Sequence, residues 1–150
     1  MMIDASLLDF VKTGEIGPIH IGQERDDVLS SIGKPNLWGT EEHMSLAGIW
    51  RYGDIEIHFE CNKVVMIFSD HDNLNDGGNS INIDSWGIKR DLNIKSFQKK
   101  LQDQGVSFKS KHHLSKVDVI VNESSLFTFY EQPDGSKRLH YWLAGRISVT

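Results

Sequence analysis

The segment Asp54-Ile55-Glu56-Ile57-His58-Phe59-Glu60 alternates strictly between polar and apolar residues. A period of two is typical of a β-strand that has one face in the protein core and the other in solvent. The polar side of this strand carries three acids and one histidine, so we expect it to form part of an acidic sheet face. The segments on either side of it then have to supply its neighbouring strands and a cover for its apolar side.

Two flanking segments share this period and predict an antiparallel meander. Ala47–Tyr52 precedes the central strand at the turn residue Gly53, and Lys63–Ser69 follows it after the turn Cys61-Asn62. The turn-rich residues 70–80 then lead into a second half of the chain. Further strands are predicted there for Ile81–Trp86, Val117–Val121, Leu126–Tyr130, Lys137–Leu143 and residues 146–149.

Apolar residues at helical spacing predict three helices, over residues 3–12, over residues 24–32 and after Asn93. Asn93 is the expected N-cap of the third helix, and Asp4 or Ser6 is the expected N-cap of the first. Glycines supply the stops, because glycine readily adopts the left-handed conformation that ends a helix. Together these patterns predict an α+β fold, with helices packed on one face of an antiparallel sheet. The glycines that are expected to end these three helices are Gly14, Gly33 and Gly105.

We expect residues 1–150 to form one domain that contains two similar halves. Residues 1–72 and residues 80–150 both follow the order of a helix that ends at glycine, a loop and a meander of about three strands. Few residues are identical between the two halves, so a duplication that gives them one shared sheet is a hypothesis at this point.

Residues 17–35, which read GPIHIGQERDDVLSSIGKP, place Ile-Gly before a short helix and Ile-Gly-Lys-Pro at its end. This motif resembles the β-lactamase-inhibitor-protein-like group, which includes small outer-membrane assembly lipoproteins. The resemblance covers about residues 16–70. It implies helices paired with one face of an antiparallel sheet, a unit that occurs twice in the inhibitor proteins, and a function in binding a target through the exposed face.

The chain departs from the exported members of that group in three ways. It has no lipoprotein cysteine near its start, we expect no export signal there, and the single cysteine Cys61 excludes an internal disulfide. The roles of the exported members therefore do not transfer. By type alone, a small acidic protein of this kind also resembles the immunity proteins that neutralise bacterial toxins.

Charge and hydropathy limit the cellular compartment and the class of partner that the sequence allows. The net charge is −5, with thirteen Asp/Glu against five Lys/Arg in residues 1–75. An acidic half argues against nucleic acid as the partner, because phosphates require clustered Lys and Arg. It suits a basic protein partner, or it serves solubility alone. No run approaches the about 18 apolar residues of a membrane span, so we expect a cytoplasmic protein with no membrane partner.

The sequence predicts no catalytic residue, no metal ligand and no cofactor. His112 and His113 are adjacent, so on a strand they point to opposite faces and cannot share an ion. Asp70-His71-Asp72 lacks the remaining acids of a calcium loop. Cys61 sits in a predicted turn without an orienting base. No phosphate-binding glycine motif is present.

The polar sheet face is the predicted partner-binding surface, because aromatic residues surrounded by charges are typical of binding hot spots. We predict that the chain is a non-catalytic cytosolic inhibitor of the immunity type, and that this face blocks a basic toxin domain. A small-ligand or regulatory module with a pocket between helices and sheet, or an enzyme, remains the alternative. A second alternative is that the tryptophans lie in the core and not on this face. The predicted residues are Trp50, Tyr52, Asp54, Glu56, His58, Glu60, His140 and Trp142.

Overall fold

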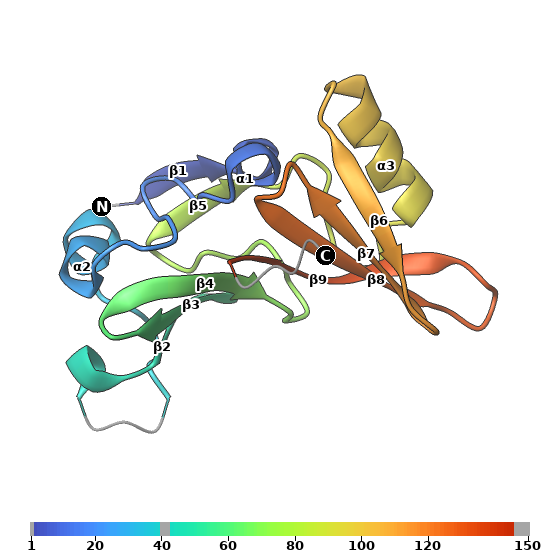
Figure 1. Ribbon diagram of the computed structural model, residues 1–150. Coiled ribbons are helices and arrows are strands. Elements are labelled where there is room, and N and C mark those ends of the chain that lie inside the picture. The colour runs from blue at the N-terminus through green and yellow to red at the C-terminus, as the bar shows by residue number, and fades with distance from the viewer. Residues whose placement is uncertain (1, 40–42, 146–150) are drawn as a thin grey trace.

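The central meander forms where the alternating pattern predicts it. In the computed structural model, which describes residues 2–39 and 43–145, strands β2 (Ile49–Tyr52), β3 (Ile55–Glu60) and β4 (Lys63–Ser69) pair in antiparallel order (Figure 1). Ile55, Ile57 and Phe59 point into the core, as expected from a period of two.

The second half of the chain extends this sheet. Strands β6 (Phe108–His112), β7 (Lys116–Val121), β8 (Ser125–Glu131) and β9 (Lys137–Ala144) join it through β4, which gives seven strands in the order β2-β3-β4-β9-β8-β7-β6. The sequence did not predict β6, because four of its five residues are exposed and it has no apolar alternation. The edge strand predicted over residues 146–149 lies outside the described residues.

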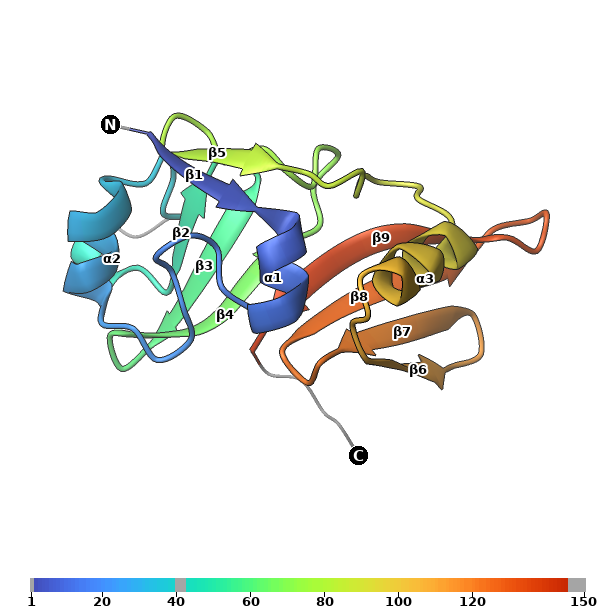
Figure 2. The ribbon, with the colours of Figure 1, turned by 90° about the horizontal axis from the view of Figure 1, so that it is seen from above.

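Three helices lie on one side of this sheet, and the predicted α+β fold is confirmed (Figure 2). They are α1 (Leu7–Thr13), α2 (Arg25–Ile32) and α3 (Ile94–Asp103), with one turn of 3₁₀ helix, η1 (Met44–Leu46), before β2. Ser6 caps α1 and Asn93 caps α3 through side-chain oxygens that accept backbone N–H groups. Gly14 ends α1 in the left-handed conformation.

The first predicted helix is too long, because its first turn is a strand. Strand β1 (Ile3–Ser6) pairs in parallel with β5 (Ile81–Asp84), so these two strands form a separate small sheet. Figure 2 shows this pair on the same side of the large sheet as α1. The backbone partners of β1 lie far along the chain, and local helical spacing cannot reveal them.

Aromatic side chains fill the space between the helices and the sheet. Phe10 of α1 packs at 4.7 Å from Trp142, and Phe97 of α3 packs at 4.6 Å from Phe127, measured between ring centroids. All four rings are fully buried. Burial of such rings dominates the stability of small domains, and here it joins helices and strands from both halves of the chain.

The backbone of residues 16–28 recurs 69 residues later. The hydrogen bond from Ile19 N to Ile16 O (2.9 Å) has its equivalent from Ile88 N to Ser85 O (2.8 Å). Two further pairs also recur with donors 69 residues apart, and in the second of them the acceptors are 75 residues apart. These are Gln23 N to His20 O with Leu92 N to Lys89 O, and Gly22 N to Val64 O with Asp91 N to Leu139 O. The recurrence supports the hypothesis of two similar halves that share one sheet.

Candidate functional site

The sheet face opposite the helices, which we call the open face, carries one continuous row of side chains. Each member lies directly opposite the next on the neighbouring strand, so the row crosses all seven strands. Its ends are charged, its middle is apolar, and most of the apolar members are only half-buried. The row runs Arg51, Glu56, Phe68, Leu143, Leu126, Ile120 and Lys109.

Aromatic rings extend this apolar middle toward one end of the sheet. Phe68 lies 5.6 Å from Tyr141, and Tyr130 lies 4.7 Å from His140 in an edge-to-face arrangement. Tyr130 and Tyr141 are 6.5 Å apart, so the four rings form one cluster, all of them half-buried. Half-buried rings beside charged residues give a surface that can bury a large apolar area against a partner.

The sequence predicts an acidic sheet face, but the open face carries charge of both signs. At the β2–β3 end, Asp54 forms an ion pair of 2.9 Å with Arg51, which offsets its charge. At the β6–β7 end, Lys109 and Lys116 stand on neighbouring strands. The open face therefore carries both signs of charge, with Glu56 and Glu60 on β3 and with Lys109, Lys116 and Asp118 on β6 and β7.

Glu56 is held between two histidines. One carboxylate oxygen lies 3.0 Å from His58 Nε2, and the other lies 2.9 Å from His71 Nε2. Hydrogen bonding to His58 is the largest cause of a lowered Glu56 pKa, followed by partial burial, which opposes it, and by the bond to His71. The carboxylate therefore stays ionised in acid solution further than an ordinary glutamate.

Stability is expected to depend on pH through Glu56. Because its pKa is lower in the folded state, it stabilises the fold above the ordinary glutamate value of about 4.3, and this contribution is lost as pH falls through the lowered pKa. Glu56→Gln should flatten the acid limb of a plot of unfolding free energy against pH, measured in urea. His58→Ala should flatten it in part. A Glu56→Gln profile that coincides with the wild-type one would contradict the assignment.

The structure corrects the predicted positions of Trp50 and Tyr52. Both are buried on the core side, because Trp50 stands opposite Ile57 and Tyr52 opposite Ile55 in the antiparallel register. The Tyr52 hydroxyl donates to Gly33 O at 2.8 Å, and burial raises the Tyr52 pKa. These rings are therefore part of the core and not of the open face.

Trp142 is also in the core, and a β-bulge is the reason. Thr128 pairs with Tyr141 but Phe129 pairs with Leu139, so His140 is an extra residue in β9. The alternation shifts at this point, and both Leu139 and Trp142 point inward. His140 remains half-buried beside Tyr130, where burial and then the nearby Arg90 charge lower its pKa.

Sequence reasoning missed most of the apolar middle of the open face. Phe68, Leu126, Tyr130, Tyr141 and Leu143 were not among the predicted residues. A usable signal was present, because β4 and β8 are apolar at consecutive positions and such strands have apolar surface on both faces.

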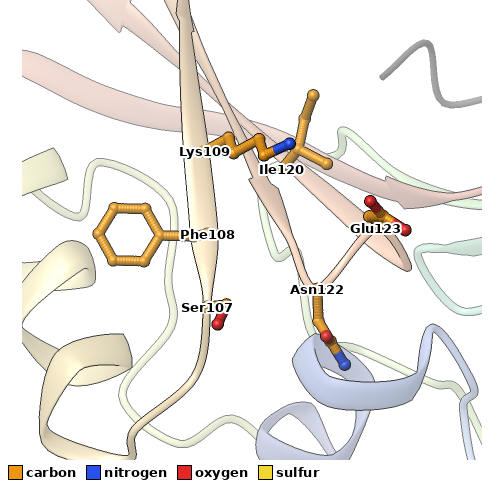
Figure 3. Close-up of a pocket in the computed structure, with 6 residues that line it drawn as sticks. All are labelled: Ser107, Phe108, Lys109, Ile120, Asn122 and Glu123. Atoms are coloured by element: carbon orange, nitrogen blue, oxygen red, sulfur yellow. The ribbon is translucent and has the colours of Figure 1, made fainter. Parts of the chain in front are cut away.

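A small hollow lies where β6 begins and β7 ends (Figure 3). Its volume is about 180 Å³, which is below the roughly 300–1,000 Å³ of most ligand pockets. Lys109 and Ile120 lie together on one side of the hairpin and Phe108 on the other (Figure 3). The hollow therefore lies at the edge of the sheet, between its two faces, and is too small to enclose most small-molecule ligands.

Comparison of the chain with family models, with curated proteins and with solved structures gave no match. The resemblance to the β-lactamase-inhibitor-protein-like group thus rests on the motif in residues 17–35. No helix within residues 2–39 and 43–145 has the length and the apolar composition that a membrane-spanning helix requires.

Proposed function

We propose that the chain is a non-catalytic protein-binding inhibitor, of the type of the bacterial immunity proteins, that docks on its target through the open face. The observation that carries this proposal is the cross-sheet row with its apolar middle. A half-buried centre of Phe68, Leu126, Tyr141 and Leu143, with charged residues at both ends, has the arrangement of core and rim that protein interfaces share.

The proposed target is a toxin domain with a basic surface, met by the chain in the cytoplasm. The net charge of −5 favours electrostatic steering of a basic target, and Glu56 and Glu60 lie at the acidic end of the open face. The apolar middle supplies the affinity in this proposal, and the charges at the two ends set the orientation.

A small-ligand module is less well supported by the packing. The space between helices and sheet holds the fully buried rings of Phe10, Phe97, Phe127 and Trp142, at centroid separations of 4.6 to 6.1 Å. Such packing is that of a protein interior, and a ligand would have to displace core side chains to enter it. Protein docking on a surface that is already formed needs no such rearrangement.

Tyr141→Ala is expected to weaken target binding by roughly 30-fold or more, because truncation of a central interface aromatic costs about 2 kcal/mol or more. The target is to be captured by co-expressing the tagged chain with the products of neighbouring genes, and the complex titrated by calorimetry at two salt concentrations. Phe108→Ala is the matched control, since Phe108 is a half-buried aromatic on the helix side of the sheet. Equal affinity of wild type and Tyr141→Ala, or no effect of charge reversal at Glu56 and Glu60, would refute docking on this face.

A further inference from the structure

Beside the acidic end of the open face, three metal-ligating side chains converge from two segments, and His58 lies next to one of them. Glu56 and His58 come from β3, and Asp70 and His71 come directly after β4. Oxygen or nitrogen atoms of Glu56, Asp70 and His71 all lie within 4.8 Å of one another, and this is the one such group found among the residues that the structure describes. The two segments meet because Glu56 pairs with Phe68, two residues before Asp70.

The spacing of these atoms suits a small cation. His71 Nε2 lies 2.9 Å from a Glu56 oxygen and 3.7 Å from an Asp70 oxygen. A tetrahedral ion with bonds of about 2.0–2.1 Å separates its ligand atoms by roughly 3.4 Å, between these two values. His58 Nε2 lies 3.0 Å from the second Glu56 oxygen, outside this group of three, and holds the carboxylate in place.

The geometry points to a binding site for a divalent transition-metal ion of the zinc class, with Glu56, Asp70 and His71 as ligands and a fourth position left for water. Mixed imidazole and carboxylate donors favour such ions over calcium or magnesium, which prefer oxygen ligands alone. The two carboxylates balance the charge of the ion. The sequence predicted no metal ligand, because Glu56 and His71 are fifteen residues apart and only the β3–β4 register brings them together.

Neighbouring groups hold the ligands in place. The Arg90 guanidinium donates to the Asp70 carbonyl at 2.9 Å, which fixes the start of the loop after β4. The side chains of Glu56 and His58 are 16% and 19% exposed, so strand packing restricts their rotamers. His71 and Asp70 are 29% and 45% exposed, which leaves a path for the ion from solvent. Rigid donors on one side and access on the other are what a metal site needs.

The test is titration of tag-free full-length protein with Zn²⁺ by calorimetry, with Co²⁺ absorption spectra as a report of coordination. Wild type should bind one Zn²⁺ per chain, and Co²⁺ should give the visible bands of a nitrogen- and oxygen-bound ion. His71→Ala should weaken Zn²⁺ binding by about tenfold or more and abolish the Co²⁺ bands. In chelator it should keep the wild-type circular dichroism spectrum and a cooperative unfolding transition, with a small drop in midpoint from the lost Glu56 hydrogen bond, which separates loss of the site from loss of the fold.

His113→Ala is the matched control. His113 Nε2 also lies 3.0 Å from a carboxylate, that of Asp118, but the described residues add no third ligand there. This variant should keep wild-type affinity and spectra. Tyr141→Ala should keep them as well, so the metal site and the docking proposal stand or fall separately. The site is overturned if wild type shows no saturable binding, or if His71→Ala binds Zn²⁺ as wild type does.

Discussion

Trp142→Ala should lower the free energy of unfolding by about 3–5 kcal/mol, a large part of the roughly 5–15 kcal/mol that stabilises a domain. Trp142 is fully buried and its ring lies 4.7 Å from Phe10, so truncation leaves a cavity where α1 meets the sheet. Urea denaturation measured by circular dichroism gives the value. If Trp142 were on the partner-binding surface, as the sequence predicts, the variant would lose affinity and keep its stability.

Trp142→Phe provides the control for this experiment. The indole N–H of Trp142 is buried with no hydrogen-bond partner among the described residues. Phenylalanine fills much of the same volume and removes this unsatisfied donor, so we expect a change of only about 1 kcal/mol or less. A Trp142→Phe variant as unstable as Trp142→Ala would show that the indole N–H has a role that the packing does not explain.

Arg25→Met should lower the free energy of unfolding by about 2–4 kcal/mol. Arg25 is only 7% exposed, and its guanidinium donates to Ala47 O at 2.6 Å and to Asn62 Oδ1 at 3.0 Å. It also lies 4.2 Å from the centroid of the Phe59 ring. Methionine keeps the aliphatic stem but leaves the buried Ala47 carbonyl without this donor, and the connection from α2 to the segment before β2 is lost.

Lys63→Met is the matched control for Arg25→Met. Lys63 pairs with Glu24 at 3.7 Å, next to Arg25, but both side chains of this pair are more than half exposed. Exposed ion pairs contribute about 0–1 kcal/mol, so the control should unfold at nearly the wild-type urea concentration. Equal losses in the two variants would contradict a specific role for the buried guanidinium.

Local signals in the sequence were sufficient for the central meander, for α2 and α3, and for the second part of the first predicted helix. Gly33 and Asn93 mark helix ends through backbone chemistry that acts within one turn, and Ile55, Ile57 and Phe59 mark the core side of β3. The β1–β5 pair was missed, since its hydrogen bonds join residues more than seventy positions apart. Sequence periodicity carries no information on which distant strand satisfies a backbone group.

The difference between local signals and long-range pairing also explains which residues of the candidate site could be predicted. Glu56 and His58 followed from the alternation of β3, and their side chains do lie on the open face. The position of Trp142 was predicted wrongly, because the bulge at His140 moves the next residues of β9 to the opposite face. His71 lies in a loop, where no periodicity applies, and its contact with Glu56 depends on tertiary register.

The row across the open face has a centre, and the two halves of the chain are related about it. The hydrogen bonds that make Val64 equivalent to Leu139 also make Phe68 equivalent to Leu143, and these two residues face each other across β4 and β9. Counting outward, Glu56 corresponds to Leu126, and Arg51 to Ile120. The backbone thus approximates a half-turn symmetry that the side chains break, because charged Glu56 and Arg51 on one arm correspond to apolar Leu126 and Ile120 on the other. A partner that docks on this surface in one orientation would meet mismatched chemistry after rotation by a half-turn, so we expect the proposed complex to form in a single orientation.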